Sequence, residues 1–306
     1  MVFSLILPKE AKEIVLPRTL NHGTIFLLIN GVIGPDDRPL YQKIKFNWHN
    51  VEFAEPVGVT VLSNVIEFLR KSGVRVTFSD YDLKSPGFRY LDDSGFFRHY
   101  FKHSIGANAS LRPTTLPLEL VSYDKSYSYV DDKLLSWLAK VFSTAPRNLG
   151  TIKVCFHEIF NNIRDHSQQK IACSFAQYYP NKKEVKIAIS DFGVGIPSNV
   201  EKVRLGLTDQ GAIELACQEG FTTSSTPRNR GAGLDVLIKN VVGRNKGTII
   251  INSRRGAFSC TPNSSGITRT PRSAPGMYPG TLINIVLKVN NELIDEDVEE
   301  DFSWTS

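Results

Sequence analysis

The segment from Leu149 to His166 has two distinct faces, and this feature constrains the fold of the chain more than any other. Glu158, Asn162 and Asp165 stand at i, i+4 and i+7, so on a helix turning about 100° per residue they share one narrow polar face. The pattern predicts a helix over 149–166 that packs on a core with polar groups at its edge. The apolar stripe beside that face consists of Ile152, Cys155, Phe156, Ile159 and Ile163.

A carboxylate, an amide oxygen and a second carboxylate on one helix face form a set of hard oxygen ligands. Such a set suits Mg²⁺ and an attacking water molecule. An ordinary solvated helix face would carry the same residue types, so this helix alone leaves both interpretations open.

The second motif is Ser190-Asp191-Phe192-Gly193-Val194-Gly195-Ile196, directly after a β-type apolar run. An Asp at a strand end, followed by alternate glycines, lets the backbone approach a flat ligand closely. The Asp191 carboxylate can accept a hydrogen bond from an exocyclic amine such as that of adenine. A plain turn would use the same residues, so this motif by itself identifies no ligand.

The third motif is Arg230-Gly231-Ala232-Gly233-Leu234, which opens a helix expected over 234–242. Glycines at a helix N-terminus expose backbone N–H groups and the positive end of the dipole, which suits phosphates. No Gly-Lys-Ser/Thr follows, which excludes a P-loop, and the spacing differs from a dinucleotide fingerprint. Gly280-Thr281, at the start of a strand expected over 281–289, is the fourth motif.

Taken together in this order and spacing, the motifs E-x-x-x-N-x-x-D, D-x-G-x-G-I, G-x-G-L and G-T resemble the GHKL superfamily. That superfamily includes DNA gyrase, MutL, the large heat-shock chaperone, histidine kinases and anti-sigma-factor serine kinases. The resemblance covers roughly 130–290. It implies an α/β sandwich of the Bergerat type, with helices packed on a mixed sheet, that binds ATP and Mg²⁺.

The resemblance also implies a role for each matching residue. Glu158 would be the general base that activates water, Asn162 the Mg²⁺ ligand and Asp191 the acceptor for the adenine amine. A carboxylate at Asp165 departs from the kinase type and is more like gyrase, which favours hydrolysis over phosphotransfer. The other positions implied to bind nucleotide are Gly193, Gly195, Ile196, Arg230, Gly231, Ala232, Gly233, Leu234 and Thr281, with a lid at about 198–230.

The N-terminal half has the pattern of an α/β unit. Strands are expected at 24–34, 43–48 and 74–78, with a helix over 57–71 capped by Gly73. Residues 20–105 resemble a STAS domain of the anti-sigma-factor antagonists, but the regulatory turn reads Glu55-Pro56-Val57-Gly58 and has no hydroxyl to phosphorylate. A small α/β docking or dimerisation module explains the pattern equally well.

These patterns predict an α/β chain of two domains, namely a STAS-like domain at 1–110, a linker at 111–128 and the ATP-binding domain at 129–290, followed by an acidic tail at 291–306. Further helices are expected at 134–142 and 211–218, and strands at 171–178, 184–190 and 247–252. The Ser/Pro/Gly/Arg-rich stretch 254–280 is expected to be a long loop, whose role the sequence does not indicate.

Composition limits the partners and the compartment. The formal net charge of +5 is dispersed apart from arginines at 254, 255, 269 and 272, so we expect no nucleic-acid partner. The 4 cysteines form no CxxC pair, which favours packed, reduced thiols over a metal site. No apolar stretch approaches the roughly 20 residues that span a bilayer and no leader pattern is present, so we expect a cytoplasmic protein without a membrane partner.

We therefore expect a cytoplasmic Mg-ATP-binding regulatory protein that hydrolyses ATP and has a nucleotide-driven lid. The expected partners are ATP and another protein, for which a STAS-like protein and a second copy of this chain are the candidates. One alternative is a protein serine/threonine kinase of the anti-sigma-factor type that acts on a STAS-like partner. Another is a non-catalytic sensor that binds the nucleotide without turning it over.

Overall fold

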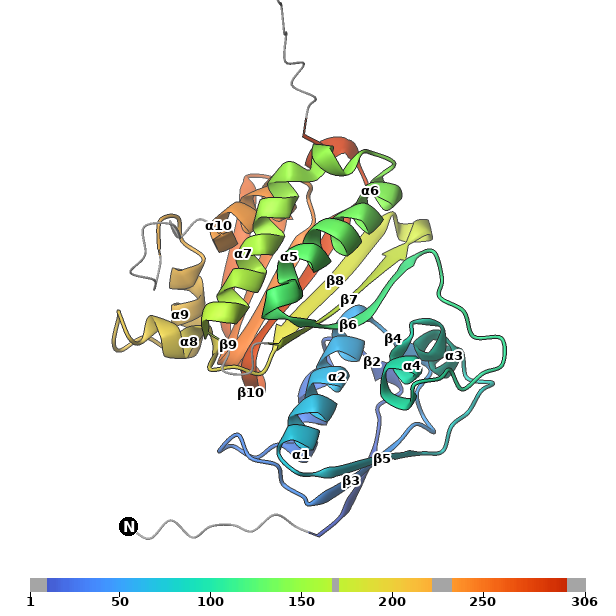
Figure 1. The fold of residues 1–306 in the computed structure, drawn as a ribbon. Coiled ribbons are helices and arrows are strands. Elements are labelled where there is room, and N and C mark those ends of the chain that lie inside the picture. The colour runs from blue at the N-terminus through green and yellow to red at the C-terminus, as the bar shows by residue number, and fades with distance from the viewer. Residues whose placement is uncertain (1–9, 167–170, 222–232, 296–306) are drawn as a thin grey trace, which may run out of the picture.

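The computed structural model describes residues 10–166, 171–221 and 233–295 and has an α/β fold. A five-stranded sheet in the order β6-β7-β8-β10-β9 forms its centre (Figure 1). Every strand pairing in this sheet is antiparallel, so the expectation of a mixed sheet is wrong. Short connections join β7 to β8 and β9 to β10, and such hairpins impose antiparallel pairing. Its strands are β6 (Thr115–Ser122), β7 (Ile171–Tyr179), β8 (Glu184–Asp191), β9 (Thr248–Asn263) and β10 (Gly266–Lys288).

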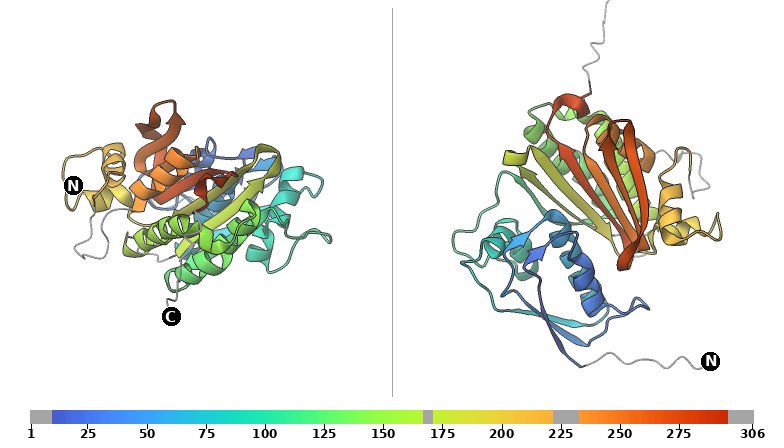
Figure 2. Two further views of the ribbon diagram at one scale, coloured as in Figure 1. Left: turned by 90° about the horizontal axis from the view of Figure 1, so that it is seen from above. Right: turned by 180° about the vertical axis from the view of Figure 1, so that it is seen from behind.

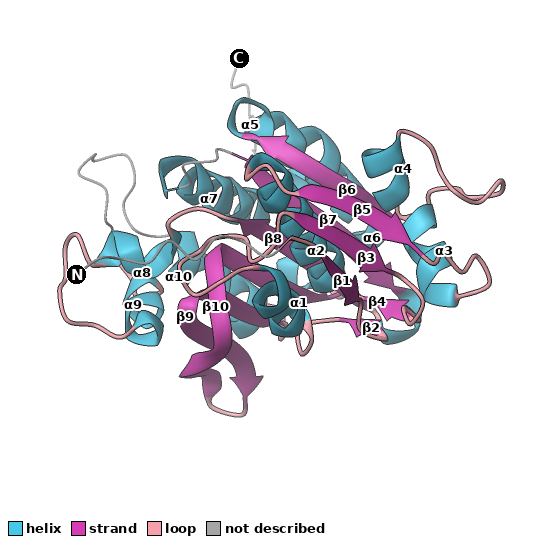
Figure 3. Cartoon of the chain, turned by 90° about the horizontal axis from the view of Figure 1, so that it is seen from below, coloured by secondary structure: helices cyan, strands magenta, loops and turns pink. Residues whose placement is uncertain are grey.

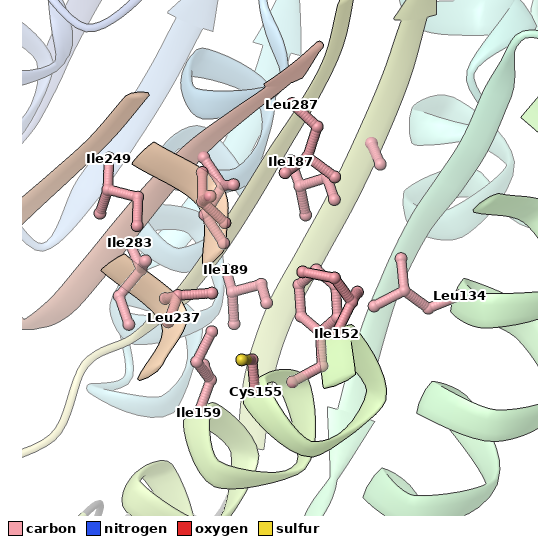
Figure 4. Packing of buried hydrophobic residues seen from close by; sticks show 14 of the residues in the cluster. Leu134, Ile152, Cys155, Ile159, Ile187, Ile189, Leu237, Ile249, Ile283 and Leu287 are labelled. Carbon is pink, nitrogen blue, oxygen red and sulfur yellow. The ribbon is translucent and has the colours of Figure 1, made fainter. Parts of the chain in front are cut away.

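One face of the sheet is covered by α6 (Ser136–Phe142), α7 (Gly150–His166) and α10 (Gly233–Ile238). The expected helices over 134–142, 149–166 and 234–242 are thus confirmed, although π-helical stretches at Tyr129–Leu135 and Lys239–Arg244 adjoin α6 and α10. Figure 4 shows Ile152, Cys155 and Ile159 of α7 pointing into the core beside Ile189. The remaining segments of this half are α5 (Ser126–Ser128), α8 (Gly195–Val200), α9 (Asp209–Ala216) and 3-10 turns at Tyr123–Lys125, Pro146–Leu149, Pro180–Lys182 and Asn291–Leu293.

The N-terminal half builds a small parallel sheet in the order β1-β3-β5 and a two-stranded pair, β2-β4. The helix expected over 57–71 is confirmed, and Gly73 ends it in the left-handed conformation (φ +80°). The strands are β1 (Lys12–Val15), β2 (Thr19–Leu20), β3 (Lys43–Asn47), β4 (Phe53–Ala54) and β5 (Arg75–Ser79), and the helices are α1 (Ile25–Val32), α2 (Pro56–Lys71), α3 (Pro86–Asp93) and α4 (Phe96–Phe101).

The strand expected at 24–34 is wrong, because most of this segment forms helix α1. Its buried residues recur with the helical spacing i, i+1, i+3, i+4 and i+7, while Leu27 between them is 69% exposed. An apolar run this short carries no alternation that separates a strand from a buried helix. The buried set is Ile25, Phe26, Leu28, Ile29 and Val32.

The long loop expected at 254–280 is also wrong, since these residues extend β9 and β10 into a hairpin beyond the sheet. Figure 2 shows this hairpin on the edge of the molecule. Pro271 is tolerated because β10 pairs only with β9 at that position, and an edge strand can lack one donor. Part of the Ser, Pro and Gly content that indicated a loop lies where the register shifts, between Ser273 and Thr281.

The second face of the five-stranded sheet is covered by the N-terminal half. Helix α2 packs across β7 and β8, and α1 packs against β10 (Figure 3). One buried apolar cluster therefore joins α1 and α2 to the sheet and to Phe192, which directly follows β8. The sheet residues in this cluster include Phe175, Ala188, Tyr278 and Leu282. An ion pair crosses the same boundary, where Lys186 Nζ lies 2.6 Å from Glu55 Oε1.

The expected domain division stays a prediction, and β6 bears on where a boundary can lie. This strand occupies part of the expected linker 111–128 and pairs with β7 along the sheet edge. Residues 115–122 are therefore structural members of the sheet. Within the described residues, none of the helices combines the length and apolar character that a bilayer crossing requires.

Because one core cluster spans both halves, we expect the full chain to unfold in a single transition. Phe175→Ala removes a ring that is 0% exposed in that cluster and should lower the free energy of unfolding by about 3–5 kcal/mol. Scanning calorimetry would show one transition with a lower midpoint. Val154→Ala, at a site 56% exposed, is the control and should leave the midpoint nearly unchanged. Two transitions, only one of which moves, would contradict a shared core.

Candidate functional site

The side chains of Glu158 and Asn162 are half-buried on α7, beside its buried apolar stripe. Ile152, Cys155 and Ile159 anchor that stripe, each 1% exposed, so the polar face stands at the border of the core. The backbone of Asp165 lies within α7, but its side chain falls outside the described residues. The roles predicted for these three residues stay predictions.

Gly233 brings the start of α10 against Glu158. A Cβ atom at this glycine would lie only 2.8 Å from Glu158 Cβ and 3.4 Å from Glu158 Oε2. Leu234, the next residue, is 8% exposed and packs into the same core as Ile159. The chain thus places the end of the third motif beside the predicted base. Arg230, Gly231 and Ala232 lie outside the described residues.

Asp191 ends β8 as a buried carboxylate, 4% exposed. Its Oδ1 accepts hydrogen bonds from the backbone N–H groups of Gly193 and Thr281, both at 3.0 Å. Thr281 is the direct cross-strand neighbour of Asp191, so the fourth motif meets the second across β8 and β10. Burial raises the pKa of Asp191 to about 6, and the two backbone hydrogen bonds oppose that rise.

Two positions near Asp191 favour glycine, because each has a positive φ and leaves too little space for a Cβ atom. Gly280 has φ +98°, and a Cβ there would lie 2.4 Å from Asp191 O and 2.5 Å from Oδ1. Gly195 has φ +82°, and a Cβ there would lie 2.6 Å from Ser253 Oγ. Both conformations disfavour L side chains, so the backbone surrounds this carboxylate at close range.

Ser253 belongs to this site although sequence reasoning missed it. Its Oγ donates to Gly280 O at 2.6 Å and accepts from Ile196 N–H at 3.0 Å, so one buried hydroxyl holds both glycine turns. Its register partner on β10 is Thr281. The sequence carried a weak signal, since Ser253 directly follows the strand expected at 247–252, but the expected loop at 254–280 concealed its strand pairing.

The alternation of side chains along β8 places Asp191 on the side of the sheet that α7 covers. Val185, Ile187 and Ile189 all pack in the core that contains α7, and alternate strand residues share a face, so Asp191 continues this row. Helix α7 also contacts both α8 and α10. The predicted residues therefore form two groups on one side of the sheet, one around Glu158 and Gly233 and one around Asp191.

His157 lies beside this polar face but is engaged by other residues. Its Nε2 lies 2.8 Å from Asp131 Oδ1, and Tyr127 stacks on its ring with centroids 4.5 Å apart. Lys153 Nζ reaches the other oxygen of Asp131 at 2.8 Å. These contacts give His157 a packing role on α7.

No protein-family model matches this chain, and no curated protein does. Among solved structures, this chain is similar to the ATP-binding domain of topoisomerase IV from Francisella tularensis in complex with a small-molecule inhibitor. The similarity covers 40% of this chain and 31% of that one, with 14% sequence identity and a TM-score of 0.24. The N-terminal domain of a DNA repair protein is similar over 34% and 27%, at 21% identity and a TM-score of 0.16. This chain thus spans about a third of each matched chain.

The raised pKa of Asp191 predicts a measurable cost to the fold. The carboxyl of an unfolded Asp has a pKa near 3.9, whereas that of folded Asp191 has a pKa of about 6. The free energy of unfolding should therefore fall as the pH rises from about 4 to 6, and it should stay lower above pH 6. Asp191→Asn should remove this fall, and it should raise the free energy of unfolding by up to about 3 kcal/mol at pH 7.5.

Urea unfolding at pH 4.5 and 7.5 measures both effects. Asp132→Asn, at an exposed carboxylate, is the control and should keep the pH dependence of the wild type. A variant Asp191→Asn that is less stable than the wild type at pH 7.5 would contradict the burial argument.

Proposed function

We propose that this chain is a cytoplasmic regulatory protein that binds Mg-ATP and hydrolyses it. The observation that carries the proposal is Asp191, a buried carboxylate enclosed by backbone at Gly193, Gly280 and Thr281. Burial opposes the ionised form of this group, so it costs the fold stability at neutral pH. A titratable group kept at such a cost is characteristic of a functional site.

The surroundings of Asp191 suit a purine with an exocyclic amine. A carboxylate accepts hydrogen bonds through two oxygens, and a buried acceptor discriminates strongly against a ligand that brings no donor. Gly193 and Gly195 place no side chain over this region, so a flat ring can approach the backbone. Ile196, half-buried against the core, supplies an apolar surface beside it.

The residues around α7 fit the phosphate end of such a nucleotide. The backbone at Gly233 approaches Glu158 so closely that a Cβ there would lie 2.8 Å from Glu158 Cβ. The described residues contain no group of three His, Cys, Asp or Glu side chains able to hold a metal ion. The amide oxygen of Asn162 suits Mg²⁺ that takes its other ligands from phosphate oxygens and water. When bound, Mg²⁺ supplies charge neutralisation and alignment of those oxygens.

In the proposed reaction, Glu158 holds the attacking water and accepts one of its protons. The water oxygen forms a bond to the γ-phosphorus as the bond to the β,γ-bridging oxygen breaks, which yields ADP and inorganic phosphate. The side chain of Glu158 is half-buried at the edge of the core.

The proposed lid at 198–230 would respond to the nucleotide. Its described part includes α9, which β9 anchors through a hydrogen bond from Arg255 N–H to Asp209 Oδ2 at 2.8 Å. Residues 222–230 lie outside the described residues. A protein partner, or a second copy of this chain, would respond to the position of the lid.

The proposal is tested by incubating the full chain with Mg²⁺ and γ-labelled ATP. Glu158→Gln should lower the release of free phosphate by about 100-fold or more and change the Kd for ATP little, because the general base acts mainly in the transition state. Glu292→Gln, at an exposed carboxylate of the same half and outside the proposed lid, is the control. Label transferred to a STAS-like protein would instead identify the kinase alternative, and binding without turnover in the wild type would identify a sensor.

Gly233→Ala tests the contact between the two motifs without removing a functional group. The new Cβ would lie 2.8 Å from Glu158 Cβ, so the glutamate must shift, and displacement of a catalytic group by about 1 Å can cost about 100-fold in rate. Gly243→Ala is the matched control, since its Cβ would meet only Ile267 Cδ1 at 3.5 Å. Equal phosphate release by both variants would contradict the proposed place of Glu158.

A further inference from the structure

The residues on either side of Asp191 are held by the N-terminal half. Ser190 Oγ accepts a hydrogen bond from Asn64 Nδ2 of α2 at 2.6 Å. The Phe192 ring meets Phe68 of α2 edge-on, with centroids 5.7 Å apart. Asn64 and Phe68 stand at i and i+4, so they share one helix face and contact both neighbours of Asp191 at once.

Tyr278 of β10 closes this contact into a buried network. Its hydroxyl hydrogen-bonds to Ser190 Oγ, and its ring packs edge-on against Phe192 at 5.5 Å. Ser190 and Tyr278 are 0% exposed, and Asn64 and Phe192 are also buried. Hydrogen bonds in such a low-dielectric environment are stronger than at the surface, and a satisfied network rigidifies its members.

We propose that Asn64 and Phe68 are positioning residues for Asp191, so that the N-terminal half sets the adenine selectivity of the nucleotide site. This inference rests on the proposed function of Asp191. Because neighbouring residues of a strand face opposite sides of the sheet, α2 holds Ser190 from behind while Asp191 faces the α7 side. Neither Asn64 nor Phe68 has to touch the nucleotide.

A displaced Asp191 would affect only ligands that donate to it. ATP carries the 6-amino group, whereas ITP presents an oxygen at that position and has the same sugar and triphosphate. Loosening the end of β8 should therefore weaken ATP binding far more than ITP binding. General loss of structure would instead weaken both nucleotides alike.

The experiment measures the Kd of Mg-ATP and Mg-ITP for the full chain by titration calorimetry. Asn64→Ala should lower the preference for ATP over ITP by about tenfold, comparable to losing one hydrogen bond to a charged group. Glu55→Gln is the matched control, because it breaks the 2.6 Å ion pair between the residue that precedes α2 and Lys186, toward the other end of β8. This control should keep the wild-type preference.

The outcomes separate this inference from the proposed function. A wild type that binds no ATP overturns both. Suppose instead that the wild type prefers ATP. If Asn64→Ala then keeps that preference, or binds both nucleotides equally more weakly, the positioning role is overturned and the proposed function stands. Should Asn64→Ala fail to fold, Phe68→Leu keeps the apolar bulk but loses the ring contact with Phe192. This second variant must lower the same preference, and an unchanged value overturns the inference.

Discussion

The burial of β8 on both faces is the constraint on which the rest of the structure depends. Its alternate side chains divide between two cores: Ile187 and Ile189 pack with α7, and Ala188 packs with α2. Antiparallel sheets commonly leave one face to water, but here the N-terminal half covers that second face. The two halves of the chain therefore pack on opposite faces of the strand that ends in Asp191.

The candidate site combines rigidity with a stability cost. Asp191 keeps a carboxylate where burial opposes its charge, and Gly195 and Gly280 adopt conformations that only glycine adopts readily. Such features persist when the surrounding structure over-determines them. Ser253, which bonds both turns, and the Asn64–Ser190–Tyr278 network behind the strand do so here. The site is thus supported by side chains from both halves.

The packing of α2 also bears on the expected STAS-like role of the N-terminal half. The turn at Glu55, where that resemblance would place a regulatory hydroxyl, faces the chain's own sheet and is ion-paired with Lys186. Gly58 lies so close to Leu20 O that a Cβ would meet it at 2.3 Å, which leaves this turn no space for a larger residue. Contacts of this kind suit a half that packs on the chain's own sheet more than a docking module with a free turn.

The sequence by itself determined the amphipathic helices and the residues proposed for chemistry, because a helical period and an Asp or Gly beside a strand end are local features. Helix α7 and helix α2 follow from such spacing, as does the strand that carries Asp191. Only the tertiary structure decided that 25–32 is a helix, that 254–280 is a hairpin and that Ser253 joins two turns. Each of these three features depends on a part of the chain that is distant in sequence and packs against the segment. A local sequence pattern does not specify that packing partner.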